Sequence, residues 1–364
     1  MGKKRILMAM SGGIDSTVAA MLLIDKGYEL EGVTFRSYDN ISTACMEKET
    51  GCCNVDSIFE AKEIADKFGF PHQILDIRKH FEDTVIDNFI AEYLAGRTPN
   101  PCVVCNSSIK WGEIVNKADE LSCDYIATGH YANIIEENNR FFIQKGKDTS
   151  KDQSYFLWNL SQDNLRRTMF PLGNLTKTEV RKIALEKGFV KLSKKRESQE
   201  ICFIPDNNYR RFLRENVPDY DKKFKPGDFV DTSGKILGQH KGYPNYTIGQ
   251  RKGLEIAVGY PLYVNKIIPE TNTVVLGTRD ELKSKIFYVE NFNIMKYKTL
   301  PDNLEVLAKI RYRNNGDTAV ITKENDKLLR VEYYNPVESI TPGQSAVFYE
   351  NDYLIGGGII KYVE

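Results

Sequence analysis

The sequence predicts an α/β fold with a parallel sheet in its first half and one or two small β domains in its second half. Up to about residue 208, short apolar runs alternate with helix-like segments, an order typical of a doubly wound parallel sheet. Beyond that point helical periodicity fades, Gly and Pro recur, and short β-rich runs dominate. A second break falls near Leu282–Lys285, so we expect domains at 1–208, 209–282 and 283–364. A chain of 364 residues suits about two or three domains.

The individual elements follow from local patterns in chain order. Ile6–Met10 is a continuous apolar run, as in a strand buried on both faces, and the following helix Thr17–Lys26 stops at Gly27. The same patterns predict strands at Leu30–Phe35, Gln73–Asp76 and Tyr125–Thr128 and helices at Ser57–Phe68, Phe81–Leu94 and Trp111–Leu121. A capping box at Thr176–Glu179 opens a helix that ends near Gly188. The second half has β-rich runs at Thr273–Leu276, Ala319–Thr322, Ala346–Tyr349 and Gly358–Ile360.

Composition describes an ordinary globular chain, with 41% apolar and 27% charged residues. Fifty Lys and Arg balance fifty Asp and Glu, which excludes a generic polycationic nucleic-acid coat. The charge is nevertheless segregated, because residues 181–196 hold seven basic residues against Glu186 alone and three arginines follow within 210–214. The N-terminal residues lack a signal-peptide core, and no run approaches the ~20 apolar residues of a membrane span. We therefore expect a cytoplasmic protein with no membrane partner.

A Gly-rich turn, Ser11–Ser16, lies between the first predicted strand and the first predicted helix. Backbone N–H groups at a helix start, glycines that allow close approach and nearby hydroxyl groups together suit a phosphate. Asp15 suits a Mg²⁺ ion beside a triphosphate. The turn lacks the Lys-Ser/Thr of a Walker A loop and the third glycine of the dinucleotide fingerprint. The structural alternative is a tight turn capped by Ser or Asp.

The cysteines are the second candidate for chemistry. Seven cysteines in a chain expected in a reducing compartment indicate metal binding or catalysis more than disulfides. Cys102 and Cys105 form a CxxC just before a predicted helix, whose N–H groups favour a thiolate. Cys202 follows the basic cluster Lys194–Arg196, which has the same effect.

Several interpretations of these thiols remain open. A structural zinc site lacks a second CxxC-like pair, and a thioredoxin-like pair would follow the first strand of its fold. In sulfur transfer, one thiol carries a sulfane sulfur as a persulfide and a second thiol attacks it. Alternatively, three cysteines hold an iron–sulfur cluster with one iron open to sulfide. We expect Cys123 to be an inert core residue, and we assign no role to Cys45, Cys52 and Cys53.

The loop resembles the pyrophosphatase loop of the ATP-pyrophosphatase superfamily, whose members cleave ATP between its α and β phosphates. Together with the other motifs, nearly the whole chain resembles the tRNA-specific 2-thiouridylase family. The matching stretches are Ala9–Ser16, Gly96–Pro101, Cys105-Asn106, Ala127–Tyr131, Lys151–Phe156, Ile201–Ile204, Thr247–Gly253, Arg311–Arg313 and Thr341–Tyr349. Position 102 departs from the family pattern, because many members have Asp where this chain has Cys102. That change completes the CxxC and favours a cluster or a Cys102–Cys105 disulfide.

The resemblance implies a fold and a set of site residues. The fold is a Rossmann-like domain of the adenine nucleotide α-hydrolase type, a small central tRNA-contacting domain and a C-terminal β-barrel. The catalytic residues are the nucleophile Cys105 and the persulfide carrier Cys202, which with Cys102 are also the candidate cluster ligands. The implied ATP-binding residues are Ala9, Met10, Ser11, Gly12, Gly13, Ile14, Asp15, Ser16, Phe35 and Gly129. The implied tRNA contacts are Asn100, Pro101, Cys102, His130, Lys151, Asp152, Gln153, Arg311, Tyr312 and Gln344.

Some of the implied tRNA contacts have purely structural alternatives. His130 follows a strand and a glycine, where a histidine often only satisfies backbone groups. Lys151–Gln153 has the composition of a helix cap with a solvated face. Arg311–Arg313 alternates charge with an aromatic ring, which suits an exposed strand as well as stacking on RNA.

The implied reaction is 2-thiolation of the anticodon wobble uridine. The C2 oxygen of the uridine attacks the α-phosphate of ATP and releases pyrophosphate, and sulfur from a Cys202 persulfide or from cluster-bound sulfide then displaces AMP. The implied cofactors are ATP and Mg²⁺, with an iron–sulfur cluster as the alternative sulfur source. The implied partners are tRNA and a sulfur-donor protein, either a cysteine desulfurase or a sulfur relay carrier. The rival functions are an ATP-dependent amide ligase or amidotransferase subunit, which needs neither thiol, and a non-catalytic RNA-binding module.

Overall fold

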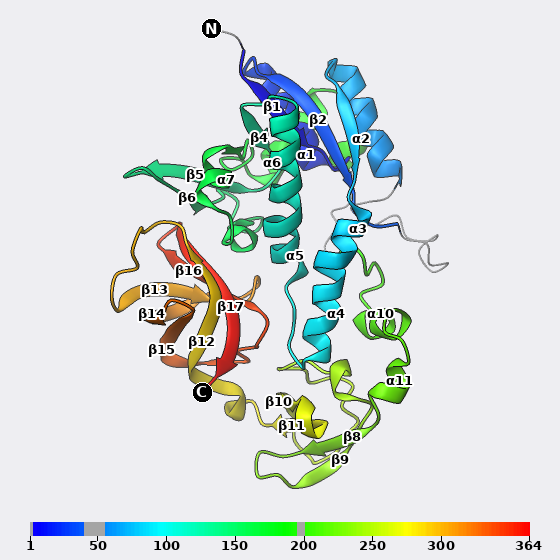
Figure 1. Ribbon diagram of the computed structural model, residues 1–364, viewed down its shortest axis with the longest axis vertical. Coiled ribbons are helices and arrows are strands. Elements are labelled where there is room, and N and C mark those ends of the chain that lie inside the picture. The colour runs from blue at the N-terminus through cyan, green and yellow to red at the C-terminus, as the bar shows by residue number, and fades with distance from the viewer. Residues whose placement is uncertain (1–2, 40–54, 195–200) are drawn as a thin grey trace. The chain divides into compact units, whose positions relative to one another are not determined.

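The computed structural model describes residues 3–39, 55–194 and 201–364 (Figure 1). Its contacts divide the chain into two compact units, and each is described by itself. The α/β unit comprises residues 1–85, 102–207 and 352–355, and the β-rich unit comprises residues 86–101, 208–351 and 356–364. Cys45, Cys52 and Cys53 lie outside the described residues.

The α/β unit is built on a five-stranded sheet in the order β3-β2-β1-β4-β7. Its strands are β1 (Arg5–Ala9), β2 (Glu29–Arg36), β3 (His72–Asp76), β4 (Tyr125–Ala127) and β7 (Thr168–Met169). All neighbouring pairs are parallel, which confirms the predicted sheet type. The central strand β1 is fully buried at Ile6, Leu7 and Met8, as its continuous apolar run predicts.

Helices cover both faces of this sheet. The long ones are α1 (Ile14–Asp25), α2 (Val55–Phe68), α6 (Trp111–Glu120) and α8 (Lys177–Glu186). Ile6 and Met8 pack in one core cluster with residues of α1, α2 and α8. Leu7 points to the opposite face because side chains alternate along a strand, and α6 contacts β1 and β4. The doubly wound arrangement expected for the first half of the chain is confirmed.

Two predicted helices have different boundaries in the structure. The helix expected at Phe81–Leu94 consists of α3 (Arg78–Phe81), a π-helical stretch Glu82–Ile86 and α4 (Asp87–Leu94). The helix expected to start at Trp111 already starts with α5 (Pro101–Val104) and continues through a π-helical stretch, Cys105–Lys110, into α6. The start signal is Pro101, because proline favours the first position of a helix.

The α/β unit also contains an antiparallel hairpin that the strand–helix alternation does not predict. It consists of β5 (Ala132–Glu137) and β6 (Arg140–Lys145). Tyr353 and Leu354 pair with β6, which is why residues 352–355 belong to this unit. The remaining elements are a 3₁₀ turn at Ser154–Leu157, α7 (Gln162–Arg166) and α9 (Val190–Lys194).

After α4, the β-rich unit continues beyond residue 207, contrary to expectation, with two further helices. These are α10 (Tyr209–Asn216) and α11 (Tyr220–Lys223). A four-stranded sheet follows in the order β10-β11-β8-β9, with strands β8 (Gly227–Val230), β9 (Ile236–His240), β10 (Tyr263–Ile268) and β11 (Thr273–Gly277). Phe229, Val264, Val274 and Leu276 are fully buried in its core.

The C-terminal part of the chain forms a closed six-stranded barrel, as the resemblance implies. Its strands are β12 (Lys283–Ile294), β13 (Leu304–Lys309), β14 (Asp317–Asn325), β15 (Leu328–Glu338), β16 (Ser345–Glu350) and β17 (Tyr353–Val363). They follow the order β12-β15-β14-β13-β16-β17, and antiparallel pairing of β12 with β17 closes the ring. Closure leaves the barrel without an unpaired edge strand.

Across the described parts of the chain, no helix combines the length and apolar character needed to cross a membrane.

Candidate functional site

The loop Ser11–Ser16 joins β1 to α1 and is shaped by close backbone contacts. Gly12 has a φ of +67°, and a Cβ there would lie 2.1 Å from the backbone oxygen of Ser57. The Ser16 hydroxyl accepts a hydrogen bond from the Ser11 N–H at 3.2 Å and donates to the Gly13 carbonyl at 3.2 Å. Gly13 is the N-cap of α1, and no described side chain caps its N–H groups. This geometry suits an anion, as the sequence predicts.

The other predicted nucleotide contacts lie at the same carboxyl edge of the sheet. A Cβ on Gly129, which follows β4, would lie 2.8 Å from the Ser16 nitrogen. Phe35 lies near the end of β2 on the other side of β1 and is half-buried. Met10 and Ile14 are 3% and 5% exposed in the core, so only their backbone is available to a ligand. The structure therefore brings the loop, Phe35 and Gly129 together where ligands bind in open α/β sheets.

Asp15 is engaged with two side chains from distant segments. The Lys177 ammonium donates to both oxygens of Asp15, at 2.7 and 2.8 Å, and the Tyr131 hydroxyl donates to Oδ1 at 2.7 Å. Lys177 is the first residue of α8, and Tyr131 follows β4 by a few residues. Neither residue was predicted as a site residue. The capping box and the Ala127–Tyr131 motif were visible in the sequence, but neither reveals contact with Asp15.

Protein side chains alone do not complete the coordination of the Mg²⁺ expected at Asp15. Within 3–39, 55–194 and 201–364, no group of three or more His, Cys, Asp or Glu side chains is placed to hold a metal ion. Mg²⁺ commonly binds through one or two carboxylates together with substrate phosphates. Asp15 fits that mode, because phosphate oxygens of a bound nucleotide would complete the coordination.

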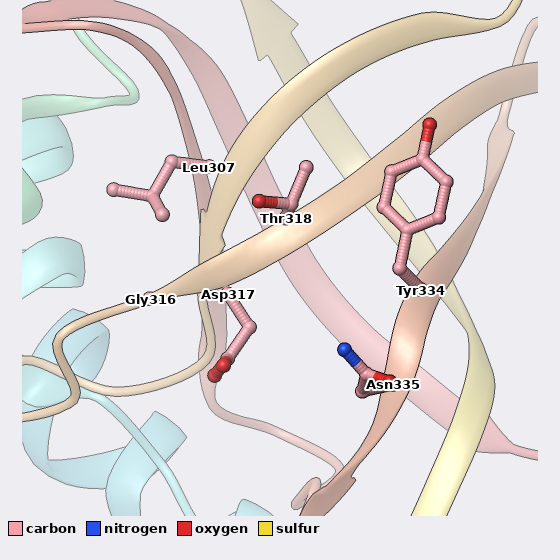
Figure 2. Close-up of a pocket in the computed structure, with 6 residues that line it drawn as sticks. All are labelled: Leu307, Gly316, Asp317, Thr318, Tyr334 and Asn335. Atoms are coloured by element: carbon pink, nitrogen blue, oxygen red, sulfur yellow. The ribbon is translucent and has the colours of Figure 1, made fainter.

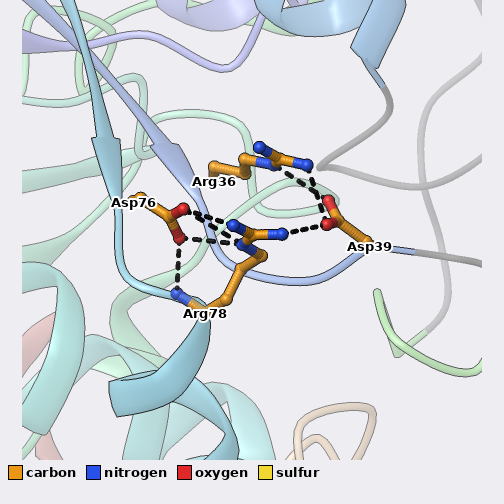
Figure 3. A network of polar contacts seen from close by, with 4 residues as sticks. All are labelled: Arg36, Asp39, Asp76 and Arg78. Atoms are coloured by element: carbon orange, nitrogen blue, oxygen red, sulfur yellow. Dashed lines mark hydrogen bonds and ion pairs between the residues drawn. The ribbon is translucent and has the colours of Figure 1, made fainter.

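A network of charged side chains lies at the ends of β2 and β3 (Figure 3). Arg36 binds Asp39 through two hydrogen bonds, at 2.9 and 2.8 Å, and Arg78 bridges Asp39 and Asp76. The Arg78 contacts lower the pKa of Asp76 to about 2, and Arg36 is the main cause of a lowered pKa at Asp39. The network fixes the chain immediately after β2.

The cysteine helix comprises α5, the π-helical stretch Cys105–Lys110 and α6. Cys102 is exposed in the first turn of α5, and Cys105 is half-buried at the start of the π-helical stretch. The prediction that both thiols precede the helix is wrong. Cys202 is half-buried in the α/β unit, and Cys102, Cys105 and Cys202 are all present as thiols rather than disulfides. The structure shows no disulfide between Cys102 and Cys105.

The three cysteines expected as alternative cluster ligands do not form a ligand group. Cys102, Cys105 and Cys202 are all described, and the described residues contain no set of three ligating side chains suited to a metal. Among the described residues, these three thiols are therefore not placed together as cluster ligands. Cys123 is 4% exposed, and burial raises the pKa of its thiol, which confirms the expectation of an inert core residue.

Asn106, next to Cys105, is buried and ties the cysteine helix to the Lys151–Phe156 motif. Its side-chain N–H donates to the Phe156 carbonyl at 3.1 Å. Its Oδ1 is buried with no hydrogen-bond partner among the described residues. At the end of the π-helical stretch, the Trp111 indole N–H donates to the Thr168 hydroxyl at 2.8 Å. Sequence reasoning placed Asn106 in a family motif but gave it no role.

Two residues of the predicted tRNA-contacting triplet have internal partners. The Asp152 carboxylate, 8% exposed, accepts hydrogen bonds from the Gly146 N–H and from the N–H and hydroxyl of Ser154. Gln153 accepts from the Tyr131 N–H at 3.0 Å. These contacts hold the turn before the 3₁₀ helix, which resembles the capping role considered from the sequence. Lys151 is half-buried.

His130 lies in an aromatic environment. Its ring packs against Trp111 and Phe170, with centroids 5.7 and 5.9 Å away, and its Nδ1 lies 2.7 Å from the Thr128 hydroxyl. Burial, helped by the Lys110 charge, lowers the pKa of His130 to about 3. The ring is therefore neutral at neutral pH.

The remaining predicted contacts lie in the β-rich unit or at its boundary. Gln344 donates to the backbone carbonyls of Thr98 and Pro99, at 3.1 and 2.9 Å, directly before Asn100 and Pro101. Asn100 is half-buried and Pro101 is buried. In the turn after β13, Arg311 is exposed and Tyr312 is half-buried. Gln344 thus supports the segment of predicted tRNA contacts, Asn100 and Pro101, from within the same unit.

The predicted basic segments are partly neutralised by the fold. Lys187 pairs with Asp25, which lies outside the basic stretch, at 2.8 Å. Of the arginines on α10, Arg210 donates to the Asn245 carbonyl, while Arg211 and Arg214 form ion pairs with Glu215 and Asp221. Counting charges along the sequence therefore overstates the positive charge available to an RNA.

A pocket of about 350 Å³ opens in the barrel wall (Figure 2). Its lining residues are Leu307, Gly316, Asp317, Thr318, Tyr334 and Asn335. None of the predicted site residues lines it.

Comparisons with known proteins match nearly the whole chain. The family models described as tRNA methyl transferase HUP domain, tRNA methyl transferase PRC-barrel domain and aminomethyltransferase β-barrel domain match residues 4–206, 211–278 and 284–360. The chain is 53% identical to the tRNA-specific 2-thiouridylase MnmA of Amoebophilus asiaticus over 99% of its own length and 96% of that protein. It is 51% identical to the protein of the same name from Cytophaga hutchinsonii, over 99% and 98% of the two lengths.

Proposed function

The chain belongs to the tRNA-specific 2-thiouridylase family, and we propose that it uses ATP to replace the C2 oxygen of the wobble uridine of tRNA with sulfur. The observation that carries the proposal is the full-length similarity to curated 2-thiouridylases, in a chain whose loop has the geometry of an anion site. In this proposal residues 1–208 carry the chemistry, residues 209–282 contact tRNA, and residues 283–364 form the barrel that presents Arg311 and Tyr312. The reaction is expected in the cytoplasm.

The first step is adenylation of the uridine. The C2 oxygen attacks the α-phosphorus of ATP, the bond to the β-phosphate oxygen breaks, and pyrophosphate leaves with the electron pair. The N–H groups at the start of α1 and the hydroxyl groups of Ser11 and Ser16 bind the phosphates, while Phe35 lies beside the base of ATP. Mg²⁺ held by Asp15 and phosphate oxygens would neutralise further negative charge.

The second step transfers sulfur from Cys202. A sulfur-donor protein, either a cysteine desulfurase or a sulfur relay carrier, loads Cys202 as a persulfide. Its terminal sulfur attacks C2 and expels AMP, and the Cys105 thiolate then attacks the Cys202 sulfur. This releases 2-thiouridine and leaves a Cys105–Cys202 disulfide, which an external thiol reduces. Because the described thiols are not placed together as cluster ligands, the persulfide route is the one proposed.

The proposed RNA contacts fall into residues that are accessible to solvent and residues that already bind protein groups. The residues accessible to RNA are Arg311 and Cys102, which are exposed, and Lys151, Tyr312 and Asn100, which are half-buried. Asp152, Gln153 and Gln344 already bind protein groups, so they support the neighbouring loops. A base in the anticodon loop must leave its stack to reach the loop and the thiols.

Mass spectrometry of tRNA incubated with the protein, ATP and a sulfur donor tests the proposal. We expect the mass of the modified uridine to rise by the difference between one sulfur atom and one oxygen atom. Cys105→Ser and Cys202→Ser should abolish the product but keep ATP binding, whereas the control Cys123→Ala should retain it. Unchanged tRNA under conditions of ATP turnover would contradict the proposal.

Other outcomes would favour the rival functions. Full turnover in both Cys105→Ser and Cys202→Ser would favour an amide ligase or amidotransferase subunit. Absence of tRNA-stimulated pyrophosphate release would favour a non-catalytic RNA-binding module.

A further inference from the structure

The nucleotide loop contains no positively charged side chain. Asp15 is the only charged residue in Ser11–Ser16, and it is negative. Cleavage of ATP between its α and β phosphates builds negative charge on the departing pyrophosphate. Walker A loops meet this need with a lysine that reaches the β and γ phosphates. A loop without such a residue requires a cation from elsewhere in the fold.

The fold brings such a cation to the loop from the start of α8. Lys177 lies 162 residues from Asp15 in the sequence, yet its ammonium donates to both Asp15 oxygens. Its side chain is only 9% exposed. The Tyr131 ring also faces this ammonium, 5.8 Å from its centroid, and the Tyr131 hydroxyl binds the same carboxylate. Burying the charge of a lysine costs free energy unless the charge is paired, and the contact with Asp15 offsets that cost. Packing alone would not require a charged side chain at this position.

The backbone of Lys177 is held in place by two carboxylates. Its N–H donates to Asp148 at 2.9 Å. The preceding residue, Thr176, is the N-cap of α8 in a reciprocal capping box with Glu179. A side chain that starts from such a fixed turn has few positions open to its ammonium group. This is the support expected for a group that must meet a ligand at a defined place.

We propose that Lys177 is a phosphate-binding residue of the ATP site, which exchanges Asp15 for the β- and γ-phosphate oxygens when Mg²⁺ and ATP bind. The exchange would preserve charge balance, because Asp15 would hold Mg²⁺ once it has lost the ammonium. Lys177 then stabilises pyrophosphate as the leaving group. The inference rests on the proposed function, since it takes the loop to be an ATP site.

Equilibrium binding of ATP and of AMP to the full chain separates this role from a structural one. Lys177→Met should weaken ATP binding roughly tenfold to a hundredfold, the range for loss of a charge-assisted contact, and leave AMP binding within about twofold. Lys177→Arg should recover part of the ATP affinity. The matched control is Lys147→Met, which removes an exposed ion pair to Glu179 at the same helix start and should leave ATP affinity unchanged.

Thermal unfolding supplies a second measurement that is independent of activity. ATP should raise the unfolding midpoint of the wild type and of Lys147→Met, but raise that of Lys177→Met much less. Unchanged ATP affinity in Lys177→Met, or equal loss of ATP and AMP binding, would overturn the inference while leaving the proposed function intact. A wild-type chain that binds no ATP would overturn both.

Discussion

The nucleotide loop and the cysteine helix belong to the same α/β unit but are fixed by different means. The loop is fixed by backbone contacts that leave no room for a side chain, as at Gly12 against Ser57 and at Gly129 against Ser16. The cysteine helix is π-helical from Cys105 and is tied down by side-chain hydrogen bonds, one of them from a buried amide whose oxygen has no partner within the described ranges. A π-helical stretch and an unsatisfied buried oxygen both cost free energy and are often found at functional sites.

This difference predicts how each region responds to substitution. A loop fixed by steric contact should fail abruptly when any atom is added. A helix fixed by individual hydrogen bonds should lose stability in small steps, one bond at a time. Substitutions in the two regions test that contrast, beginning with the largest expected effect.

Gly12→Ala should disable the nucleotide loop. The added Cβ would overlap the Ser57 carbonyl oxygen, at 2.1 Å, and an alanine is strained at a φ of +67°. We expect a loss of about 3 kcal/mol or more in unfolding free energy, together with loss of ATP binding. Denaturant unfolding and ATP titration measure the two effects.

The matched control is Gly27→Ala after α1. Gly27 has a φ of +84°, but a Cβ added there would meet no atom within 4 Å. Only the backbone strain remains, at a cost of about 1–2 kcal/mol, and ATP binding should survive. Equal losses in the two variants would show that backbone conformation, rather than contact with Ser57, fixes the loop.

Asn106→Ala should have an intermediate effect on the cysteine helix. It removes the hydrogen bond to the Phe156 carbonyl, which is then left without this donor. We expect a loss of about 1–2 kcal/mol and slower sulfur transfer, with ATP affinity retained. Denaturant unfolding and the rate of 2-thiouridine formation check this.

Ser107→Ala is the control for the cysteine helix. The Ser107 hydroxyl donates to the Val103 carbonyl within the same helix, at 3.0 Å, so its loss should cost no more than about 0.5 kcal/mol. If Asn106→Ala were equally mild, the amide bond to Phe156 would not be what holds the helix.

The contrast also explains what the sequence could predict. Gly12, Gly13 and the serines express local backbone requirements, so the loop and its place at the sheet edge could be predicted from adjacent residues. The role of Lys177 could not be predicted in this way, because only folding of the whole α/β unit brings the start of α8 to Asp15. The π-helical geometry around Cys105 was missed because its residues also suit an ordinary helix or a loop. The β5–β6 hairpin was missed because it interrupts the strand–helix alternation on which the fold prediction rested.

His130 connects the two regions, because it follows Gly129 at the loop and packs on Trp111 of the cysteine helix. Its pKa, about 3, lies below the usual histidine value because burial disfavours the charged ring. As the pH falls below about 6.5, the His130 ring therefore takes up a proton in the unfolded chain but stays neutral in the folded chain. Above that pH, the ionisation of His130 does not lower the free energy of unfolding. Below it, the free energy of unfolding falls by up to about 1.4 kcal/mol per pH unit.

Denaturant unfolding between about pH 7 and pH 5 tests the His130 prediction. The free energy of unfolding should fall less steeply with decreasing pH in His130→Gln than in the wild type. Burial lowers the pKa of His72 and His240 as well, so part of the slope should persist in the variant. Parallel slopes in the two proteins would mean that His130 is accessible to protons in the folded state.

Asp39→Asn should have the smallest effect, although it lies near the nucleotide loop. Asp39 binds Arg36 and Arg78 at the end of β2, on side chains that are partly exposed, so solvent and salt screen the interaction (Figure 3). Because the arginines lower the pKa of Asp39, its contribution is present above the usual carboxyl pKa and is lost as the pH falls through the lowered value. We expect a small drop in the unfolding midpoint that disappears at high salt or low pH, and a similar drop for the exposed pair broken by Asp83→Asn. A loss of ATP binding as large as that of Gly12→Ala would instead show that ion pairs, and not only backbone contacts, fix the nucleotide region.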